Sequence, residues 1–210
     1  MNQLEALVKT LCPNGVEYRF MWELTTWDKK FTGIEKFKQP LVIKYHYFLA
    51  NELKSLETEK GNIKLLYTNT YQGVTTEELA GEYISEGEIV AIPWGGNAQV
   101  QYFKGKFITS DNRIATSNDT SRLSNKFLYY WMLSKLPIIE SFYRGSGIKH
   151  PSMAKVLDLK VPVPPLPVQE EIVRILDKYS LMVTEMEEEL AMRRKQFEYY
   201  RDKFLTFKEI

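Results

Sequence analysis

The sequence has little of the side-chain chemistry from which metal sites and covalent cross-links are built. Its 210 residues include one cysteine, Cys12, and two histidines, His46 and His150, which lie far apart. A single cysteine excludes an internal disulfide and a cysteine-based zinc site, and the separated histidines argue against other metal sites. No apolar run approaches the length of a membrane-spanning helix, and no signal peptide opens the chain. We therefore expect a soluble cytoplasmic protein with no membrane segment and no bound metal.

Recognisable catalytic motifs are also scarce. The sequence has no G-x-x-x-x-G-K-[ST] phosphate-binding loop, and Gly95-Gly96 fits a hairpin turn rather than a dinucleotide fingerprint. One tripeptide, Glu52-Leu53-Lys54, has the Glu-x-Lys form of metal-dependent nucleases, with Asp28 as a distant possible partner. Because so short a spacing often arises by chance, a stand-alone nuclease is the weakest hypothesis, and we expect no enzymatic activity in this chain.

A long helical repeat occupies the C-terminal end of the chain. From Ile172 to Phe204, apolar and aromatic side chains recur at alternating intervals of four and three residues, and residues 169–210 contain no Gly or Pro. This period of 3.5 residues predicts a coiled-coil seam on a helix roughly 50 Å long. The seam consists of Ile172, Leu176, Tyr179, Val183, Met186, Leu190, Arg193, Phe197, Tyr200 and Phe204. Such a seam needs a partner helix, unless the helix lies along its own domain.

The rest of the chain reads as a β-rich domain. Ser124 is a candidate N-cap for a helix that Pro137 breaks or kinks. Short apolar and aromatic segments separated by turn residues predict strands at 41–49, 63–69, 88–94, 98–103, 106–109, 112–116 and 159–163, with turns at Gly73 and Gly105. A proline-rich segment ends this pattern before the long helix. We therefore expect an α+β fold, with a domain over residues 1–165 and a long helix over residues 166–210.

Charge is balanced over the whole chain but is unevenly distributed. The formal net charge is +1, whereas residues 101–160 hold ten Lys and Arg against four Asp and Glu, a local excess of 10 − 4 = +6. A basic surface on a nearly neutral chain fits a polyanionic partner. On charge alone, a solvated face of mixed charge is an equally good interpretation.

Three segments combine basic, amide and aromatic side chains in a way that suits contacts with double-stranded DNA. Lys and Arg bind phosphates, whereas Arg, Asn and Gln read base edges in the major groove. The third segment also contains glycines, which let the backbone approach a phosphate closely. The candidate DNA-binding residues are Trp27, Lys29, Lys30, Lys36, Lys38, Asn69, Tyr71, Gln72, Arg144, Ser146, Lys149 and His150. Taken singly, each segment is more simply a plain surface loop, but together, beside a dimerising helix, they favour DNA binding.

Two stretches are distinctive enough to suggest a family. These are LCPNGVEYRFMWEL near the start and FLYYWMLSKLPIIESFYRGSGIKHPSMAKVLDLKVPVPPLPVQEEIVRILDKY, which leads into the long helix. With that helix, they resemble the specificity (S) subunit of type I restriction–modification systems. The most specific piece runs from the Gly-Ser-Gly loop through Pro-Pro-Leu to Gln169-Glu170-Glu171. The resemblance is weak from Trp27 to Glu86, where members of this family are expected to differ because the region helps to set the DNA sequence read.

The resemblance implies a target recognition domain followed by a spacer helix, in a subunit without catalytic activity. Such a subunit reads one half of a bipartite, gapped DNA site and recruits methyltransferase (M) and restriction (R) subunits. S-adenosylmethionine, ATP and Mg are then expected on those partners, and no cofactor is expected in this chain. The alternative is a coiled-coil scaffold or regulatory protein whose β domain binds another protein.

Typical members of the family carry two such units, whose spacer helices pair antiparallel, whereas this chain carries one. We therefore expect a homodimer with antiparallel helices, unless the chain is one half of a longer protein. The charges on the helix do not decide between antiparallel and parallel pairing, and the choice of antiparallel rests on the resemblance. Arg193 in the seam either pairs with an acidic residue of the opposite helix, such as Glu188, or extends to solvent.

Overall fold

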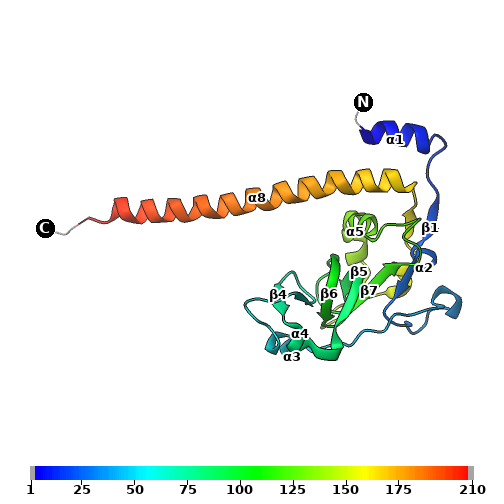
Figure 1. Ribbon diagram of the computed structural model, residues 1–210, viewed down its shortest axis with the longest axis horizontal. Helices are drawn as coiled ribbons and strands as arrows, with labels where there is room; N and C mark the ends of the chain where they lie inside the picture. The colour runs from blue at the N-terminus through cyan, green and yellow to red at the C-terminus, as the bar shows by residue number, and fades with distance from the viewer. Residues whose placement is uncertain (1–2, 208–210) are drawn as a thin grey trace.

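The chain folds into a β-rich domain from which one long helix projects (Figure 1). The structure, a computed structural model, describes residues 3–207. Figure 1 shows the sheet and its short helices gathered at one end of the molecule, with the long helix α8 (Leu166–Leu205) extending away from them. This arrangement confirms the predicted α+β fold with a long C-terminal helix.

A six-stranded sheet forms the centre of the domain within residues 3–207. Its strands lie in the order β2-β7-β5-β6-β3-β4, and all neighbours are antiparallel except β3 and β6, which are parallel. The strands are β2 (Thr25–Trp27), β3 (Ile63–Leu66), β4 (Gln72–Thr75), β5 (Ser85–Pro93), β6 (Gln101–Thr109) and β7 (Asn112–Ser117). The second half of β5 is buried on both faces: Val90 and Ile92 join one core cluster, and Ile89 and Ala91 join another.

Short helices cover this sheet. Ser124 caps α5 (Asn125–Ser134) by accepting a hydrogen bond from the backbone N–H of Phe127, and α6 (Leu136–Glu140) follows with Pro137 in its first turn. Phe127 and Leu128 of α5 pack on the sheet. The other short helices are α2 (Met21–Leu24), α3 (Ala50–Ser55), α4 (Glu77–Ala80), α7 (Met153–Leu157) and the single 3-10 turns η1 (Lys36–Lys38) and η2 (Gly81–Tyr83). The cap at Ser124 and the break at Pro137 agree with the predictions.

Two small strand pairs complete the domain. β1 (Tyr18–Phe20) pairs with β10 (Lys160–Pro162), and β8 (Tyr143–Arg144) pairs with β9 (His150–Pro151). The first pair holds the beginning of the domain beside the segment that enters α8. The second pair closes a hairpin over residues 144–150, which bears on the candidate site below.

Three local predictions are wrong. Residues 41–49 form no strand but an irregular segment with isolated bridges at Val42 and Tyr47, and Leu41 and Leu49 are largely exposed. Gly73 lies inside β4, where an added Cβ would come within 3.0 Å of Tyr67 and 3.2 Å of Leu65. Gly105 lies in the middle of β6 with a φ of 136°. In strands, glycine marked close packing and an unusual backbone angle rather than a turn.

The first turns of α8 are fixed to the domain. The Gln169 side chain is fully buried, accepts a hydrogen bond from the backbone N–H of Ser124 at 2.9 Å, and donates to the carbonyl oxygens of Arg122 and Pro164. Asp177 accepts from Lys126 at 2.7 Å and from the Tyr130 hydroxyl at 2.6 Å. Helix α1 (Gln3–Leu11) packs against α8 at the same end (Figure 1). These contacts set the direction in which α8 leaves the domain.

Beyond Asp177 the helix is open to solvent, with a last side-chain hydrogen bond to the domain between Ser180 and Tyr130. All its residues from Lys178 to Leu205 are exposed, and seam residues such as Met186 (67%) and Phe197 (67%) expose about two thirds of their area. The 40 residues of α8 give a length of about 60 Å. The alternative in which the helix lies along its own domain is therefore wrong for its exposed length. Ile172, the first seam residue, packs against the domain core, whereas the seam from Val183 to Phe204 has no partner helix within residues 3–207.

Candidate nucleic-acid interface

Segments far apart in the sequence meet around Trp94, the residue that follows β5. Its backbone N–H donates to the carbonyl oxygen of Asp111 at 2.9 Å, and its own carbonyl oxygen lies 2.7 Å from Nδ1 of His150. The Lys29 ammonium lies 5.4 Å from the centroid of the Trp94 ring. The backbone N–H of Gly96 donates to the carbonyl oxygen of Lys149 at 3.0 Å. The first and third predicted segments therefore share one surface through the residues after β5.

The second predicted segment reaches the same surface from the other side. Gln99 donates through Nε2 to the carbonyl oxygen of Thr68 at 2.6 Å, and Gln101 donates to that of Tyr67 at 2.8 Å. These two amides tie residues 67–72 to the segment after Trp94. We call the combined area, made of residues 29–30, 67–72, 94–101 and 144–150, the loop surface.

A buried ion pair lies beneath the loop surface. Nη1 of Arg113 in β7 lies 2.8 Å from Oδ2 of Asp28, and both side chains are fully buried. The Tyr47 hydroxyl donates to the same carboxylate, and Arg113 also pairs with Asp111. The guanidinium carbon lies 4.7 Å from the Trp94 ring centroid and 5.3 Å from that of Tyr47. Burial, followed by the Asp28 carboxylate, raises the pKa of Tyr47, so this hydroxyl stays protonated and donates.

The 144–150 hairpin presents free positive charge. Arg144, Ser146, Lys149 and His150 are exposed, and neither Arg144 nor Lys149 has an ion-pair partner in the described part of the chain. Gly145 has a φ of 148°, and a Cβ there would lie 2.7 Å from the carbonyl oxygen of Ile148. The tight hairpin therefore requires glycine, and it holds two uncompensated cations beside the Trp94 segment.

The polar side chains of the second segment are exposed but already have partners. Asn69 accepts from the backbone N–H of Tyr71 at 2.9 Å, and the Tyr71 hydroxyl donates to Glu57 at 2.6 Å. Gln72 accepts from Lys64. Asn69, Tyr71 and Gln72 are all exposed, so each can exchange these bonds for contacts with a ligand.

Residues of the first segment separate into two groups. Lys29 and Lys30 are exposed on the loop surface. Trp27 is 4% exposed, its indole N–H donates to Oγ1 of Thr25, and its ring packs on Phe31, so it is a core residue and no surface contact. Lys38 lies 2.8 Å from Asp158, which raises the pKa of the lysine and balances its charge. Lys36 is exposed in η1, at a turn that does not contribute to the loop surface.

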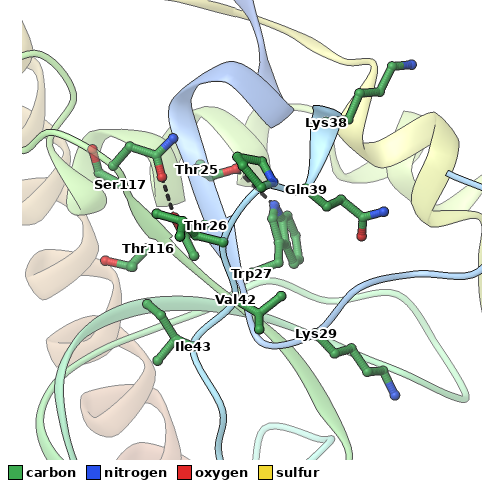
Figure 2. Close-up of a pocket in the computed structure, with 13 residues that line it drawn as sticks. Thr25, Thr26, Trp27, Lys29, Lys38, Gln39, Val42, Ile43, Thr116 and Ser117 are labelled. Carbon is green, nitrogen blue, oxygen red and sulfur yellow. Dashed lines mark hydrogen bonds between the residues drawn. The ribbon is translucent and has the colours of Figure 1, made fainter. Parts of the chain in front are cut away.

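A pocket of about 510 Å³ lies beside this first segment, between β2, β7 and residues 38–43 (Figure 2). Its wall combines hydroxyl, amide and ammonium groups with apolar side chains, and no carboxylate belongs to its lining among residues 3–207. Figure 2 shows Trp27 and Thr26 on one wall and Val42 and Ile43 on another. The arrangement holds no acid–base pair that would support catalysis.

The Glu-x-Lys tripeptide does not assemble a nuclease site. Glu52 accepts from the backbone N–H of Leu49 at 2.7 Å and thereby caps α3. Both carboxylate oxygens of Asp28 are occupied by Arg113, Tyr47 and the backbone N–H of Ile114. Residues 3–207 contain no group of three or more His, Cys, Asp or Glu placed to hold a metal, and none of their helices is long and apolar enough to cross a membrane.

Sequence reasoning missed the four residues that organise the loop surface: Asp28, Tyr47, Trp94 and Arg113. Asp28 and Arg113 are 85 positions apart, and neither has a motif around it. Trp94 was recognised only as part of a strand and its turn. The pairing arises from the sheet order β2-β7-β5, so no local signal could have revealed it.

Comparison with known proteins agrees with this picture. Residues 47–192 match the family described as type I restriction modification DNA specificity domain. A type I restriction enzyme specificity subunit of Escherichia coli is 32% identical over an alignment that covers 100% of this chain and 49% of that protein. This chain therefore spans about half the length of that relative.

Solved structures show the same fold. The S subunit of a type I restriction–modification system from M. genitalium matches with a TM-score of 0.60 at 18% identity, over 90% of this chain and 46% of that one. A second structure, from work on complex assembly and conformational transition of the type I R-M system, matches with a TM-score of 0.58 at 13% identity, over 94% of this chain and 48% of that one. With the family match covering most of its length, the chain belongs to the type I restriction modification DNA specificity domain family.

Proposed function

We propose that this chain is a DNA sequence-specificity subunit of a type I restriction–modification complex and that it has no catalytic activity of its own. The observation that carries the proposal is the loop surface, where three separate basic and amide segments meet on a domain of the DNA specificity family. Arg144 and Lys149 supply phosphate contacts, and Asn69, Gln72 and the exposed Asn97 supply groups that read base edges. The family match favours this function over that of a coiled-coil scaffold.

The proposed partners are double-stranded DNA, methyltransferase subunits and a restriction subunit. Support comes from the family and from the structural relative whose description concerns assembly of the type I R-M system. S-adenosylmethionine, ATP and Mg belong to the partner subunits in this proposal, so the chain contributes recognition and architecture.

We further propose that α8 pairs with α8 of a second copy to form a homodimer. The exposed seam supports pairing, and Arg193 supports the antiparallel direction. In a parallel, in-register pair, d residues face each other, so two Arg193 guanidinium groups would meet in the seam. In an antiparallel pair a d residue faces an a residue, and Arg193 then lies beside apolar Leu190 with its charge directed outward. Within its own helix, Nη2 of Arg193 already lies 3.4 Å from Oε1 of Glu189, and 68% of the Arg193 side chain is exposed, which is consistent with an outward direction.

The antiparallel homodimer places two identical domains at opposite ends of the paired helices. Each domain then reads one half of the site, and the half-sites are related by a two-fold axis and separated by unread DNA. For helices of this length, the unread gap is on the order of one turn of DNA, about 34 Å. The expected target is a gapped palindrome.

The test is a map of methylated bases in the host genome with and without this gene. A gapped, palindromic methylation motif that disappears with the gene is the expected result. A gapped but asymmetric motif would retain the specificity role and contradict the symmetric homodimer. Unchanged methylation would overturn the proposed function.

A further inference from the structure

The Arg113 side chain contacts residues from four separate segments of the chain. Asp28 precedes Lys29 and Lys30, Tyr47 belongs to the irregular 41–49 segment, and Asp111 lies in the turn between β6 and β7. The Trp94 ring lies over the guanidinium, and the Trp94 carbonyl oxygen forms a hydrogen bond with the His150 ring of the 144–150 hairpin. Every segment that carries a free cation of the loop surface is thus connected to Arg113 directly or through one residue.

Stability does not account for this pair. Burying two charges removes much of their hydration, and replacing a buried ion pair by apolar residues of similar volume is often neutral or stabilising. Moreover, Nε of Arg113 is buried with no hydrogen-bond partner within residues 3–207, so the guanidinium is not fully satisfied. What the pair provides instead is a fixed separation between Asp28, Tyr47, Asp111 and Trp94.

The guanidinium is also not a DNA ligand itself. Arg113 is fully buried, and its charge is balanced by Asp28 and Asp111. Phosphate contacts come from long side chains such as Lys29 and Lys149, which adapt to small shifts of their loops. Hydrogen bonds to base edges tolerate much less, because a site must hold its groups within roughly 0.5 Å of the productive geometry. Loosening the loops should therefore affect the reading of bases more than the attraction to phosphates.

We propose that the buried Asp28–Arg113 pair is a positioning device for sequence specificity, which fixes the segments at 29–30, 94–101 and 144–150, and with them the exposed Asn97 and His150, at the spacing that the target bases require. The inference rests on the proposed function and names the residues that set its selectivity. Arg113 acts through Trp94, Lys29 and His150, and so it is a positioning residue.

The experiment replaces the pair with apolar residues of similar size, Asp28→Leu with Arg113→Met, a change that leaves the net charge unaltered. The measured quantities are the unfolding midpoint, the affinity for a duplex carrying the methylated motif, the affinity for a scrambled duplex, and the salt dependence of both. We expect a lower midpoint, because the buried N–H of Ile114 and the Tyr47 hydroxyl lose their acceptor. The salt dependence should stay unchanged, and the ratio of target to scrambled affinity should fall about tenfold, the discrimination of one good base contact. An unchanged ratio would overturn the inference.

A matched control is Glu77→Gln with Lys106→Gln, which removes an exposed ion pair of 2.6 Å outside the loop surface and also preserves net charge. It should leave the ratio unchanged. If the double variant fails to fold, Tyr47→Phe removes only the hydroxyl that contacts Asp28 and Arg113, and a ratio equal to that of the unaltered protein would then contradict the inference. If the unaltered protein does not prefer the target over the scrambled duplex, the proposed function itself fails, which is a separate outcome.

Discussion

Gln169 illustrates how a single residue links recognition to assembly. Its buried amide makes three hydrogen bonds to backbone groups at Ser124, Arg122 and Pro164, which all lie on the domain side of the junction with α8. A rigid junction matters because the direction of α8 determines where a second domain would lie on the DNA. The residue stands out in the sequence through its place in the Gln169-Glu170-Glu171 motif, and the structure supplies a physical reason for glutamine there.

Replacing Gln169 with leucine should destabilise the domain. The change leaves one buried N–H and two carbonyl oxygens without partners, and each unsatisfied buried group costs about 1–3 kcal/mol. Because water reaches some of these groups, we expect the free energy of unfolding to fall by about 2–4 kcal/mol in urea denaturation. Glu170→Ala, at an exposed neighbouring position, should change it by less than about 0.5 kcal/mol. Equal stability of the two variants would contradict the assigned contacts.

Residue types alone were enough to identify the three segments that form most of the loop surface, but not to predict the buried Asp28–Arg113 pair beneath them. Lysines, amides and glycines that lie close together in the sequence can be recognised as a candidate binding segment without knowledge of the fold. The Asp28–Arg113 pair depends on strands β2 and β7 lying side by side, which follows from the whole sheet. Trp27 shows the same limit, because an aromatic residue beside lysines suggests a surface contact, whereas its strand places most of the side chain in the core and its remaining surface beside the pocket.

At the scale of elements, α8 was the most predictable part of the chain because its signal is local. A helix of 40 residues repeats its pattern many times, and the caps and breaks at Ser124 and Pro137 are equally local. Residues 41–49 gave the opposite outcome. Their apolar residues suggested a strand, but whether a strand forms depends on distant partners, and the structure offers this segment only isolated bridges to Trp27 and Thr109.

The charges beside the seam limit the registers open to the proposed antiparallel pair. With Met186 opposite Phe197 of the second copy, Val183 faces Tyr200 and Glu187 lies beside Arg194. Sliding by one heptad in one direction brings Glu187 against Glu187 of the second copy, and sliding in the other brings Arg194 against Arg194. Like charges in such positions destabilise the pair, but the second slide also brings Glu187 against Arg201 of the other copy. The charges therefore disfavour only the slide that brings Glu187 against Glu187, and we take Met186 opposite Phe197 as the register to test.

Cysteine cross-linking tests this register. In a Cys12→Ser background, Met186→Cys and Phe197→Cys chains carrying different tags are co-expressed and oxidised. A mixed disulfide between the two chains is expected, because in this register the two positions face each other across the seam, and a disulfide forms at a Cα separation of about 4.4–6.8 Å. Phe197→Cys paired with Val183→Cys is the control and should remain reduced. Cross-linking of Met186→Cys chains to one another would indicate the parallel arrangement instead.

At the scale of the whole molecule, the chain separates two tasks that make different demands on the sequence. The domain presents lysine, arginine and amide side chains above the buried Asp28–Arg113 pair, and α8 carries an exposed apolar seam away from the domain. Pairing two such units would double the number of phosphate contacts without any new surface. The contribution of Arg144 and Lys149 to DNA affinity should therefore depend on whether one or two copies of the chain bind the DNA. Measuring that contribution reports on the homodimer as well as on DNA recognition.

The salt dependence of DNA binding tests both tasks at once. Removing one phosphate-binding cation lowers the slope of log affinity against log salt concentration by about 0.9. If Arg144→Ala with Lys149→Ala removes two such cations from each of two copies, the slope of the complete complex on its methylation motif should fall by about 4 × 0.9 = 3.6, and on a duplex with a single half-site by about 1.8. Lys54→Ala with Lys195→Ala removes the same charge from positions outside the loop surface and should leave the slope nearly unchanged. Equal changes on the full site and the half-site would show that one copy engages the DNA, and no change on either would exclude the hairpin from the interface.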